Sequence, residues 1–297
     1  MSAVDARRTV LVVGGLGGLL GRAVGAELAG NFEVRSLHRR PGPGDAGDGI
    51  SFVAGDAGTI PDWAPLLEGV DAVVLLAWYR SASPRAFQRL ADGIERLLSA
   101  AGRAGVRRVV HVSVPEAPPA LERTLPYLRE KRRVDQAVVA SGIPYRILRP
   151  SAVFGPGDVL LGVMMRTIHR WGRLPMFGDG RYHLSPIASA DVGRAIRLGL
   201  DGGGSGIEEA GGPERFEYRE LAERMFAALG RPPRYLRLSP RGGHRLARLL
   251  ELAGSSLLYA YEVDWLVSDR LGLPPLRGLD RPLAPVDAYL RSVAERL

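Results

Sequence analysis

Hydrophobic residues in the first half of the chain occur in short runs that polar positions seldom interrupt. Strands that are buried on both faces show this pattern, whereas strands with one exposed face alternate between apolar and polar residues. We therefore expect these runs to form the strands of a parallel sheet. They lie at residues 9–13, 32–37, 50–54, 72–77, 109–113 and 145–149.

Segments with helical periodicity separate several of these runs, at residues 19–29, 84–104 and 126–141. The second of them begins at Ser83 and Pro84, a capping residue followed by a proline in the first turn. Strands and helices that alternate in this way predict an α/β fold. We expect a doubly wound parallel (Rossmann) sheet with right-handed crossovers.

The second half of the chain is less regular. Residues 184–200 predict a short strand followed by a helix that begins at Ser189. Residues 218–230 predict an amphipathic helix that ends at a glycine. Residues 242–270 predict two further helices, broken near residues 254–256.

We place the domain boundary near residues 150–157, where glycine and proline follow the sixth strand. Residues 1–153 are expected to form the Rossmann domain, with residues 184–205 returning to it. Residues 154–297 are expected to form a smaller substrate-binding lobe. Within that lobe, residues 242–270 could form a lid that excludes water from the pocket.

The composition is that of a soluble globular protein, with 46% hydrophobic and 24% charged residues in 297. No apolar run approaches the roughly 20 residues that a membrane span needs. Cysteine is absent, which excludes disulfides and thiol nucleophiles and fits a reducing compartment. The arginine pair before the first apolar run resembles an export signal, but glycines and Arg22 interrupt the run. We expect a cytoplasmic protein without a membrane partner.

The formal net charge is +8, which raises the question of a nucleic-acid partner. Proteins that bind nucleic acids concentrate basic residues on one face, whereas the arginines here are spread from end to end. We therefore expect no nucleic-acid partner, and no residue pattern indicates a metal site.

The first chemical motif is VVGGLGGLLGRAV, in which Gly15, Gly18 and Gly21 are spaced by three between a strand and a helix. The tight turn, the approach to a pyrophosphate and the packing of the helix on the strand each require a residue without a side chain. The helix then offers free N–H groups and a positive dipole end to phosphates. The motif predicts a dinucleotide site.

The end of the second strand indicates which dinucleotide binds. A site for NAD usually has an acid here, but residues 34–41 contain none and instead carry Arg39 and Arg40. A guanidinium suits the 2′-phosphate of NADP, so we favour NADP(H) as the cofactor. Asp56 follows the third strand. It either accepts a hydrogen bond from the adenine amino group or closes a turn.

Lys131 is the only lysine in the chain, and Tyr127 precedes it by four residues in YLREK. Within a helix the two side chains lie one turn apart on one face. The pKa of a free phenol is about 10, and a neighbouring ammonium lowers it. Tyr127 could then give a proton to a carbonyl oxygen as hydride reaches the carbon. Lys131 could also hold ribose hydroxyls, which a planar arginine would not do in the same way.

Together these residues resemble the short-chain dehydrogenase/reductase superfamily, in particular its extended and atypical branches. These branches include sugar-nucleotide epimerases and dehydratases, NmrA-like proteins and relatives of a complex I accessory subunit. The similarity continues through SGIPYRILRPSAVFGPGD and GDGRYHLSPIASADVGRAI and covers residues 8–240.

The resemblance implies that Tyr127 and Lys131 are a catalytic pair. The usual third member is a serine or threonine just beyond the fifth strand. Ser113 matches the first serine of that pattern, but Val114 stands where the substrate-binding serine is usual. Ser113 is therefore the third catalytic candidate: it could substitute for the missing serine at position 114, or a polar group of the substrate could. The residues implied to contact the dinucleotide are Gly15, Gly18, Leu20, Gly21, Arg39, Asp56, Ala77, Lys131, Pro150 and Val153.

Three functions follow from this resemblance. The first is an NADPH-dependent ketoreductase for a bulky apolar small molecule, such as a quinone or an aromatic polyketide of secondary metabolism. Trp78, Tyr79, the aromatic and sulfur-containing residues from Phe154 to Tyr182 and several leucines between 246 and 258 suggest such a substrate, although core packing also accounts for them. The second is a nucleotide-sugar epimerase or dehydratase. The third is a non-catalytic, NmrA-like NADP sensor. The chain could be a monomer or a homodimer.

Overall fold

The computed structural model describes residues 7–39, 49–81, 83–253 and 258–297. The chain divides into two compact units. The first unit consists of Met1–Val114, Pro118–Arg149 and Val192–Glu208, and the second of Pro115–Ala117, Pro150–Asp191 and Glu209–Leu297.

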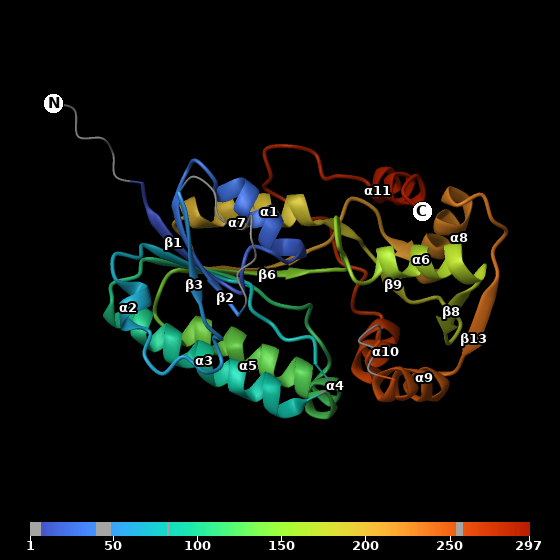
Figure 1. Cartoon of the computed structure of the whole chain (residues 1–297), viewed down its shortest axis with the longest axis horizontal. Coiled ribbons are helices and arrows are strands. Elements are labelled where there is room, and N and C mark those ends of the chain that lie inside the picture. Colours follow the sequence, from blue (N-terminus) through green and yellow to red (C-terminus); the bar gives the residue numbers. More distant parts are fainter. Residues whose placement is uncertain (1–6, 40–48, 82, 254–257) are drawn as a thin grey trace. The chain divides into compact units, whose positions relative to one another are not determined.

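A seven-stranded sheet forms the centre of the first unit, in the order β11-β6-β5-β4-β1-β2-β3 (Figure 1). The pairings from β3 to β6 are parallel, so the predicted Rossmann sheet is confirmed. Its strands are β1 (Thr9–Val13), β2 (Glu33–His38), β3 (Ile50–Ala54), β4 (Ala72–Leu75), β5 (Arg108–Val112), β6 (Tyr145–Pro150) and β11 (Gly206–Ala210). The edge strand β11 was not predicted, because its first two residues are exposed and two glutamates follow them, so it carries no apolar run.

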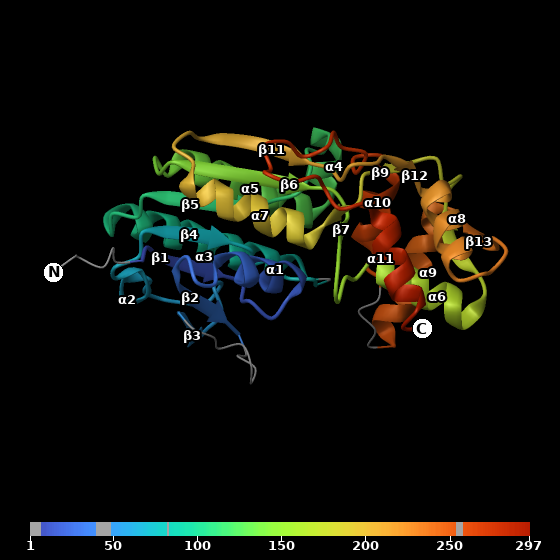
Figure 2. The same ribbon diagram turned by 90° about the horizontal axis from the view of Figure 1, so that it is seen from above.

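Helices cover both faces of this sheet (Figure 1, Figure 2). On one face lie α1 (Leu19–Leu28) and α7 (Ser189–Asp201). On the other lie α3 (Pro84–Arg103) and α5 (Pro126–Ala140), with the short helices α2 (Ala64–Leu67) and α4 (Pro119–Thr124). The apolar stripe of α3, which includes Leu90, Ile94 and Leu97, is fully buried against the sheet. The predicted helices of this unit are confirmed to within one residue at each end.

The second unit contains five helices and three two-stranded sheets among the described residues. The helices are α6 (Leu161–Trp171), α8 (Tyr218–Ala228), α9 (Pro240–Leu252), α10 (Ala260–Val267) and α11 (Val286–Ala294). The strands are β7 (Val153–Phe154), β8 (Leu174–Phe177), β9 (His183–Leu184), β10 (Ile187–Ala188), β12 (Phe216–Glu217) and β13 (Tyr235–Leu238). The two helices predicted for residues 242–270 are thus confirmed as α9 and α10, with α9 starting two residues earlier, and the predicted break near residues 254–256 lies outside the described residues. The role of these helices as a lid stays a prediction.

Most aromatic and sulfur-containing residues suggested to line a substrate pocket in fact form the core of the second unit. Met164, Met165, Phe177 and Tyr182 each expose at most 6% of their surface and pack in one apolar cluster. Burial of these large side chains contributes to the hydrophobic stabilisation of the unit. Trp171, in contrast, is 64% exposed. In the described part of the chain, no helix is both long and apolar enough to span a bilayer.

Candidate active site

The carboxyl ends of β1 to β5 meet at one edge of the sheet, because these strands are parallel. In open α/β sheets, ligands bind outside the carboxyl ends of the strands where the strand order reverses. Here the order reverses between β1 and β4. The glycine turn follows β1 directly, and the predicted site residues Arg39, Asp56, Ala77 and Ser113 follow β2, β3, β4 and β5.

Each glycine of the turn has its own structural reason. Gly15 adopts φ +80°, and a Cβ there would approach the His38 ring to 2.8 Å. A Cβ on Gly21 would lie 2.2 Å from the Gly15 carbonyl oxygen, so α1 packs directly on the turn. At Gly18, the N-cap of α1, a Cβ would meet no atom within 4 Å. Gly18 therefore borders open space, as a residue beside a pyrophosphate should.

His38 contacts the glycine turn, and this contact was not predicted from the sequence. Its ring is 7% exposed, and Nε2 accepts a hydrogen bond of 2.8 Å from the Leu16 backbone N–H. This N–H is therefore engaged within the protein. The first turn of α1, which starts at Leu19 and includes Leu20, offers further N–H groups to phosphates.

Arg39, Tyr79 and Asp56 form a connected group beyond β2, β3 and β4. The exposed Arg39 guanidinium lies over the Tyr79 ring at 5.1 Å from its centroid. The Tyr79 hydroxyl donates to Asp56, and burial together with this hydrogen bond raises the pKa of Tyr79 to about 12. Asp56 also accepts from the Gly58 N–H at 2.9 Å. Asp56 thus closes a turn. Its contact with adenine stays a prediction.

The other predicted cofactor residues are placed as follows. Ala77 donates its N–H to the Val13 carbonyl oxygen at 2.7 Å, which holds the segment after β4 against the glycine turn. Pro150 and Val153 belong to the second unit. Arg40 lies outside the described residues. The contacts of these residues with a dinucleotide remain predictions.

Lys131 is buried, with 4% of its surface exposed. Its Nζ donates to the Val112 carbonyl oxygen at 2.9 Å and lies over the Trp78 ring, 4.4 Å from the ring centroid. Burial lowers the pKa of Lys131 to about 8, although the nearby Asp135 carboxylate acts to raise it. The one lysine of the chain is therefore fixed inside the fold, at the carboxyl end of β5.

Tyr127 lies one turn before Lys131 on α5 and is half-buried. Its ring packs edge-on against Trp78, at 5.8 Å between centroids, and against Phe87, at 5.9 Å. Trp78 and Phe87 are themselves stacked at 5.7 Å. Trp78 thus contacts both members of the predicted pair and links the end of β4 to α5. Trp78 was predicted only as a residue that a substrate contacts, because the sequence does not show that residue 78 faces α5.

Ser113 is enclosed, with 4% of its surface exposed. Its Oγ is inaccessible to solvent and makes no hydrogen bond of good geometry among the described residues. It lies close enough to the Asp135 carboxylate to help lower the pKa of that group. The hydroxyl therefore belongs to a buried polar cluster on β5 and α5, and its contact with a substrate oxygen remains a prediction.

The turn, α1 and Arg39 provide what a dinucleotide requires in this unit. The open space at Gly18 leaves room for a pyrophosphate, and the first turn of α1 offers backbone N–H groups and a positive dipole end. Arg39 is exposed at the end of β2, where the adenosine ribose lies in such folds. The described residues contain no group of three or more potential metal ligands.

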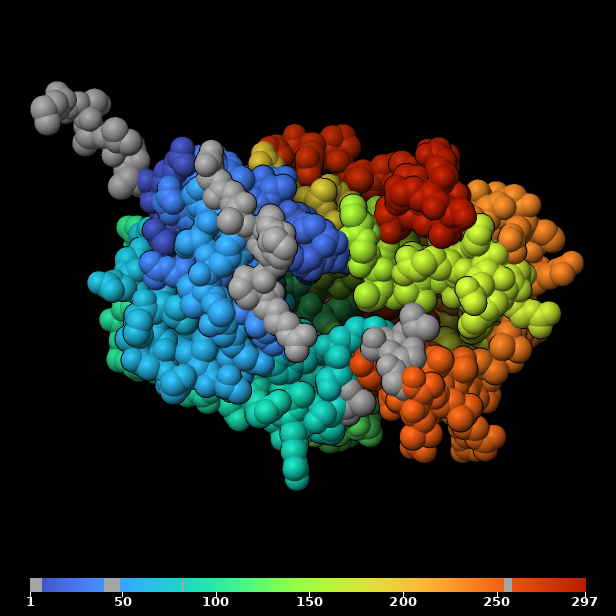
Figure 3. All heavy atoms as spheres, in the orientation of Figure 1, coloured from blue at the N-terminus to red at the C-terminus, as the bar shows by residue number. Residues whose placement is uncertain are grey.

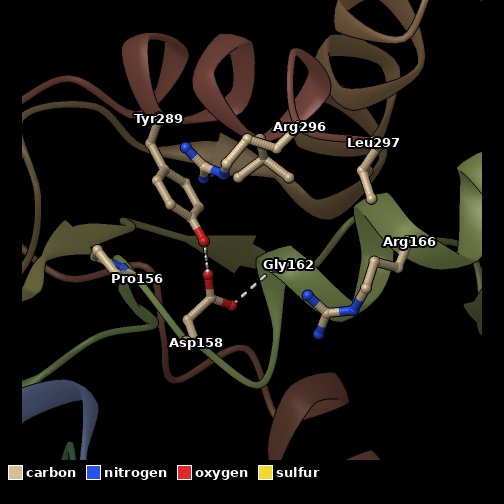
Figure 4. A pocket seen from close by; sticks show the side chains of 9 residues that line it. Pro156, Asp158, Gly162, Arg166, Tyr289, Arg296 and Leu297 are labelled. Carbon is tan, nitrogen blue, oxygen red and sulfur yellow. Dashed lines mark hydrogen bonds between the residues drawn. The ribbon is translucent and has the colours of Figure 1, made fainter.

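A separate cavity of about 380 Å³ lies within the second unit, between the start of α6 and α11 (Figure 4). The two helices are neighbours on the surface of that unit (Figure 3). Asp158 accepts hydrogen bonds from the Gly162 N–H at 2.8 Å and from the Tyr289 hydroxyl. Arg166 and Arg296 also line the cavity. The lining therefore carries two arginines and one aspartate. No sequence motif indicated this cavity.

The parallel sheet with a glycine turn after its first strand defines the class of NAD(P)-binding proteins of the Rossmann type. The sequence profile of an NAD(P)H-binding family matches residues 15–159. Within this class, the chain belongs to the short-chain dehydrogenase/reductase superfamily, in its extended and atypical branch.

Three relatives of known name support this assignment. The chain is 30% identical to (4-alkanoyl-5-oxo-2,5-dihydrofuran-3-yl)methyl phosphate reductase of Streptomyces griseus, over 76% of each chain. It is 26% identical to 2-alkyl-3-oxoalkanoate reductase of Stenotrophomonas maltophilia, over 82% of each. It is 31% identical to the mitochondrial NADH dehydrogenase [ubiquinone] 1 alpha subcomplex subunit 9 of Arabidopsis thaliana, over 45% of this chain and only 34% of the relative. The reductases among these names support an NAD(P)-dependent oxidoreductase.

The fold is shared with solved structures. A UDP-N-acetylglucosamine 4-epimerase from Methanobrevibacter ruminantium superposes with a TM-score of 0.71 over 98% of both chains, at 18% identity. At this identity the likeness shows the fold alone.

Proposed function

We propose that this protein is an NADPH-dependent ketoreductase that reduces the ketone of a bulky, apolar small molecule. The observation that carries the proposal is the buried ammonium of Lys131 one helical turn from Tyr127, at the carboxyl edge of a nucleotide-binding sheet. A surface pair would be solvated and would perturb a phenol little, whereas a buried charge interacts strongly with its neighbours. We further propose that the reaction takes place in the cytoplasm.

The chemistry divides between cofactor and protein. When bound, the reduced dinucleotide supplies a hydride to the carbonyl carbon. Tyr127 gives its phenolic proton to the carbonyl oxygen, which yields the alcohol and leaves a phenolate. Lys131 stabilises that negative charge, and solvent returns the proton. Gly18 and α1 would bind the pyrophosphate, and Arg39 would bind the 2′-phosphate that distinguishes NADPH from NADH.

The nature of the substrate is supported by the relatives and by the aromatic side chains around Tyr127. A 2-alkyl-3-oxoalkanoate contains a ketone and alkyl chains, and the relative from Stenotrophomonas maltophilia is named as its reductase. Trp78 and Phe87 pack on Tyr127 and provide apolar surface next to the proposed proton donor. An apolar ketone, a quinone or an aromatic polyketide would suit such surroundings.

The test is a measurement of cofactor binding and of turnover. NADPH should bind at least ten-fold more tightly than NADH, about 1.4 kcal/mol of preference, and NADPH oxidation should depend on an added apolar ketone. Tyr127→Phe should lower kcat by about 10²- to 10⁴-fold, the usual contribution of a general acid. Tyr145→Phe is the matched control. Tyr145 is the first residue of β6, so it lies at the amino ends of the strands and not at the carboxyl ends, where the site is.

Other outcomes would assign other functions. Undiminished turnover in Tyr127→Phe would show that the proton comes from elsewhere. NAD that copurifies with the protein would favour a nucleotide-sugar epimerase or dehydratase. NADPH binding without turnover of any ketone would favour an NmrA-like sensor.

A further inference from the structure

A buried group of polar side chains lies behind Lys131, on α5, β5 and β6. Asp135, one turn beyond Lys131 on α5, is 3% exposed. Its Oδ2 accepts hydrogen bonds of 2.9 Å from both Arg149, on β6, and Arg132. Its Oδ1 faces His111 Nε2, on β5, at 3.3 Å. The carboxylate is therefore held by side chains of three elements, and no sequence motif includes it.

His111 is the unusual member of this group. Its ring is 1% exposed, and its two nitrogens face two acceptors, the Asp135 carboxylate and the Leu75 carbonyl oxygen at 3.4 Å. Only an imidazolium could donate to both oxygens. Burial, however, lowers the pKa of His111, and the positive charge of Lys131 lowers it further. The ring is therefore neutral near pH 7, and the negative charge of Asp135 is not cancelled by it.

The charge of Asp135 is well defined. Burial acts to raise its pKa, but hydrogen bonds from His111 and Ser113 and the positive charge of Arg149 lower it to about 2. The carboxylate is thus ionised throughout the pH range in which an enzyme works. The charged or titratable groups that face it are His111 on β5, Arg149 on β6, Lys131 and Arg132 on α5, and Glu122 on α4 through Arg132.

Lys131 needs such a counter-charge. Its ammonium is out of water and contacts a carbonyl oxygen and an indole ring. Within the part of the chain that the structure describes, no carboxylate forms an ion pair with it inside 4.0 Å. A buried ammonium without a negative charge nearby loses its proton. We propose that Asp135 is a positioning residue of the reaction: its buried carboxylate keeps the Lys131 ammonium charged beside Tyr127.

This inference rests on the proposed function for its catalytic meaning, but its physical content can be tested without a substrate. Lys131 is the only lysine, so protein made with lysine labelled with ¹³C at the ε carbon gives one lysine NMR signal. The position of that signal against pH reports the ionisation of Lys131 directly. The wild-type midpoint should lie near pH 8.

The decisive variant is Asp135→Asn, which removes the charge and keeps the shape. The Lys131 midpoint in this variant should fall by about one pH unit or more, as expected when a nearby opposite charge is lost. Glu122→Gln is the matched control. Glu122 pairs with Arg132 at 3.1 Å without being the carboxylate that acts on Lys131, so its midpoint should match that of the wild type. The proposal would be overturned if the Lys131 midpoint in Asp135→Asn lay within about 0.2 pH unit of the wild-type midpoint. In free energy this difference is on the order of RT/2.

Asp135→Asn leaves Arg149 buried without its carboxylate, which can prevent folding. The double variant Asp135→Asn/Arg149→Met removes both charges together, and its midpoint should fall below that of Arg149→Met alone. Equal midpoints in these two proteins would also refute the proposal.

The kinetic readout separates this inference from the proposed function. The alkaline limb of kcat/KM should move to lower pH by the same amount as the NMR midpoint, which a purely structural defect would not cause. An NMR midpoint that moves while no ketone is reduced would support the control of Lys131 by Asp135 and reject the ketoreductase. An NMR midpoint that does not change in Asp135→Asn, together with intact turnover, would support the ketoreductase and reject the control of Lys131 by Asp135.

Discussion

Replacing Lys131 by methionine should abolish turnover and yet stabilise the folded protein near neutral pH. The pKa of Lys131 falls from 10.5 to about 8 on folding, because burial disfavours the ammonium. Each pH unit corresponds to about 1.4 kcal/mol, so the charged side chain costs the native state about 3 kcal/mol at pH 7. The hydrogen bond to Val112 and the Trp78 contact offset about 1–2 kcal/mol of this cost. Lys131→Met should therefore gain about 1–2 kcal/mol.

The advantage of the variant should disappear as the pH rises. Above pH 8 the folded wild type releases the Lys131 proton while the unfolded chain keeps it up to 10.5. The unfolded state then binds more protons, so wild-type stability rises by about 1.4 kcal/mol per pH unit relative to the variant. Near pH 9 the two proteins should be equally stable.

Urea unfolding at pH 7.0, 8.0 and 9.0, followed by tryptophan fluorescence, measures this difference. Tyrosines that titrate above pH 9 are common to both proteins and cancel in the comparison. Arg129→Met, on an exposed position of α5, is the control and should show no such pH dependence. A stability difference that stays constant from pH 7.0 to 9.0 would show that burial does not lower the pKa of Lys131.

Three further predictions concern the nucleotide site. Gly21→Ala should unfold or strongly destabilise the first unit, measured as a lowered Tm, because its Cβ would lie 2.2 Å from the Gly15 carbonyl oxygen. Gly18→Ala should keep the wild-type Tm, since its Cβ meets no atom, but should weaken NADPH binding by about ten-fold or more in a titration. Arg39→Glu should reverse the preference for NADPH over NADH, by about 1.5–3 kcal/mol of lost charge-assisted hydrogen bonding; an unchanged preference would assign the 2′-phosphate to other residues.

The parts of the site that depend on local spacing could be predicted from the sequence. Three glycines after an apolar run, and a tyrosine one helical turn before a lysine, are patterns in which neighbouring residues determine the geometry. The six apolar runs likewise predicted six parallel strands, because burial on both faces leaves a continuous apolar signature.

The parts that depend on contacts between distant segments could not be predicted. His38 contacts the glycine turn only because β1 and β2 pair in register, with Val13 opposite Leu37. Asp135 resembles an ordinary polar residue on a helix surface until Arg149 and His111 are placed against it by two strands. Buried polar clusters of this kind have no periodicity, and only tertiary structure shows which polar residues are enclosed.

A chain with one lysine, enclosed between an indole ring and a strand end, also has an unusual reactivity toward amine-directed reagents. Acylating reagents modify exposed amines in their neutral form, so in the folded protein they should modify the buried Lys131 only slowly. The rate of acylation at Lys131 would then report how often the native state opens locally at α5.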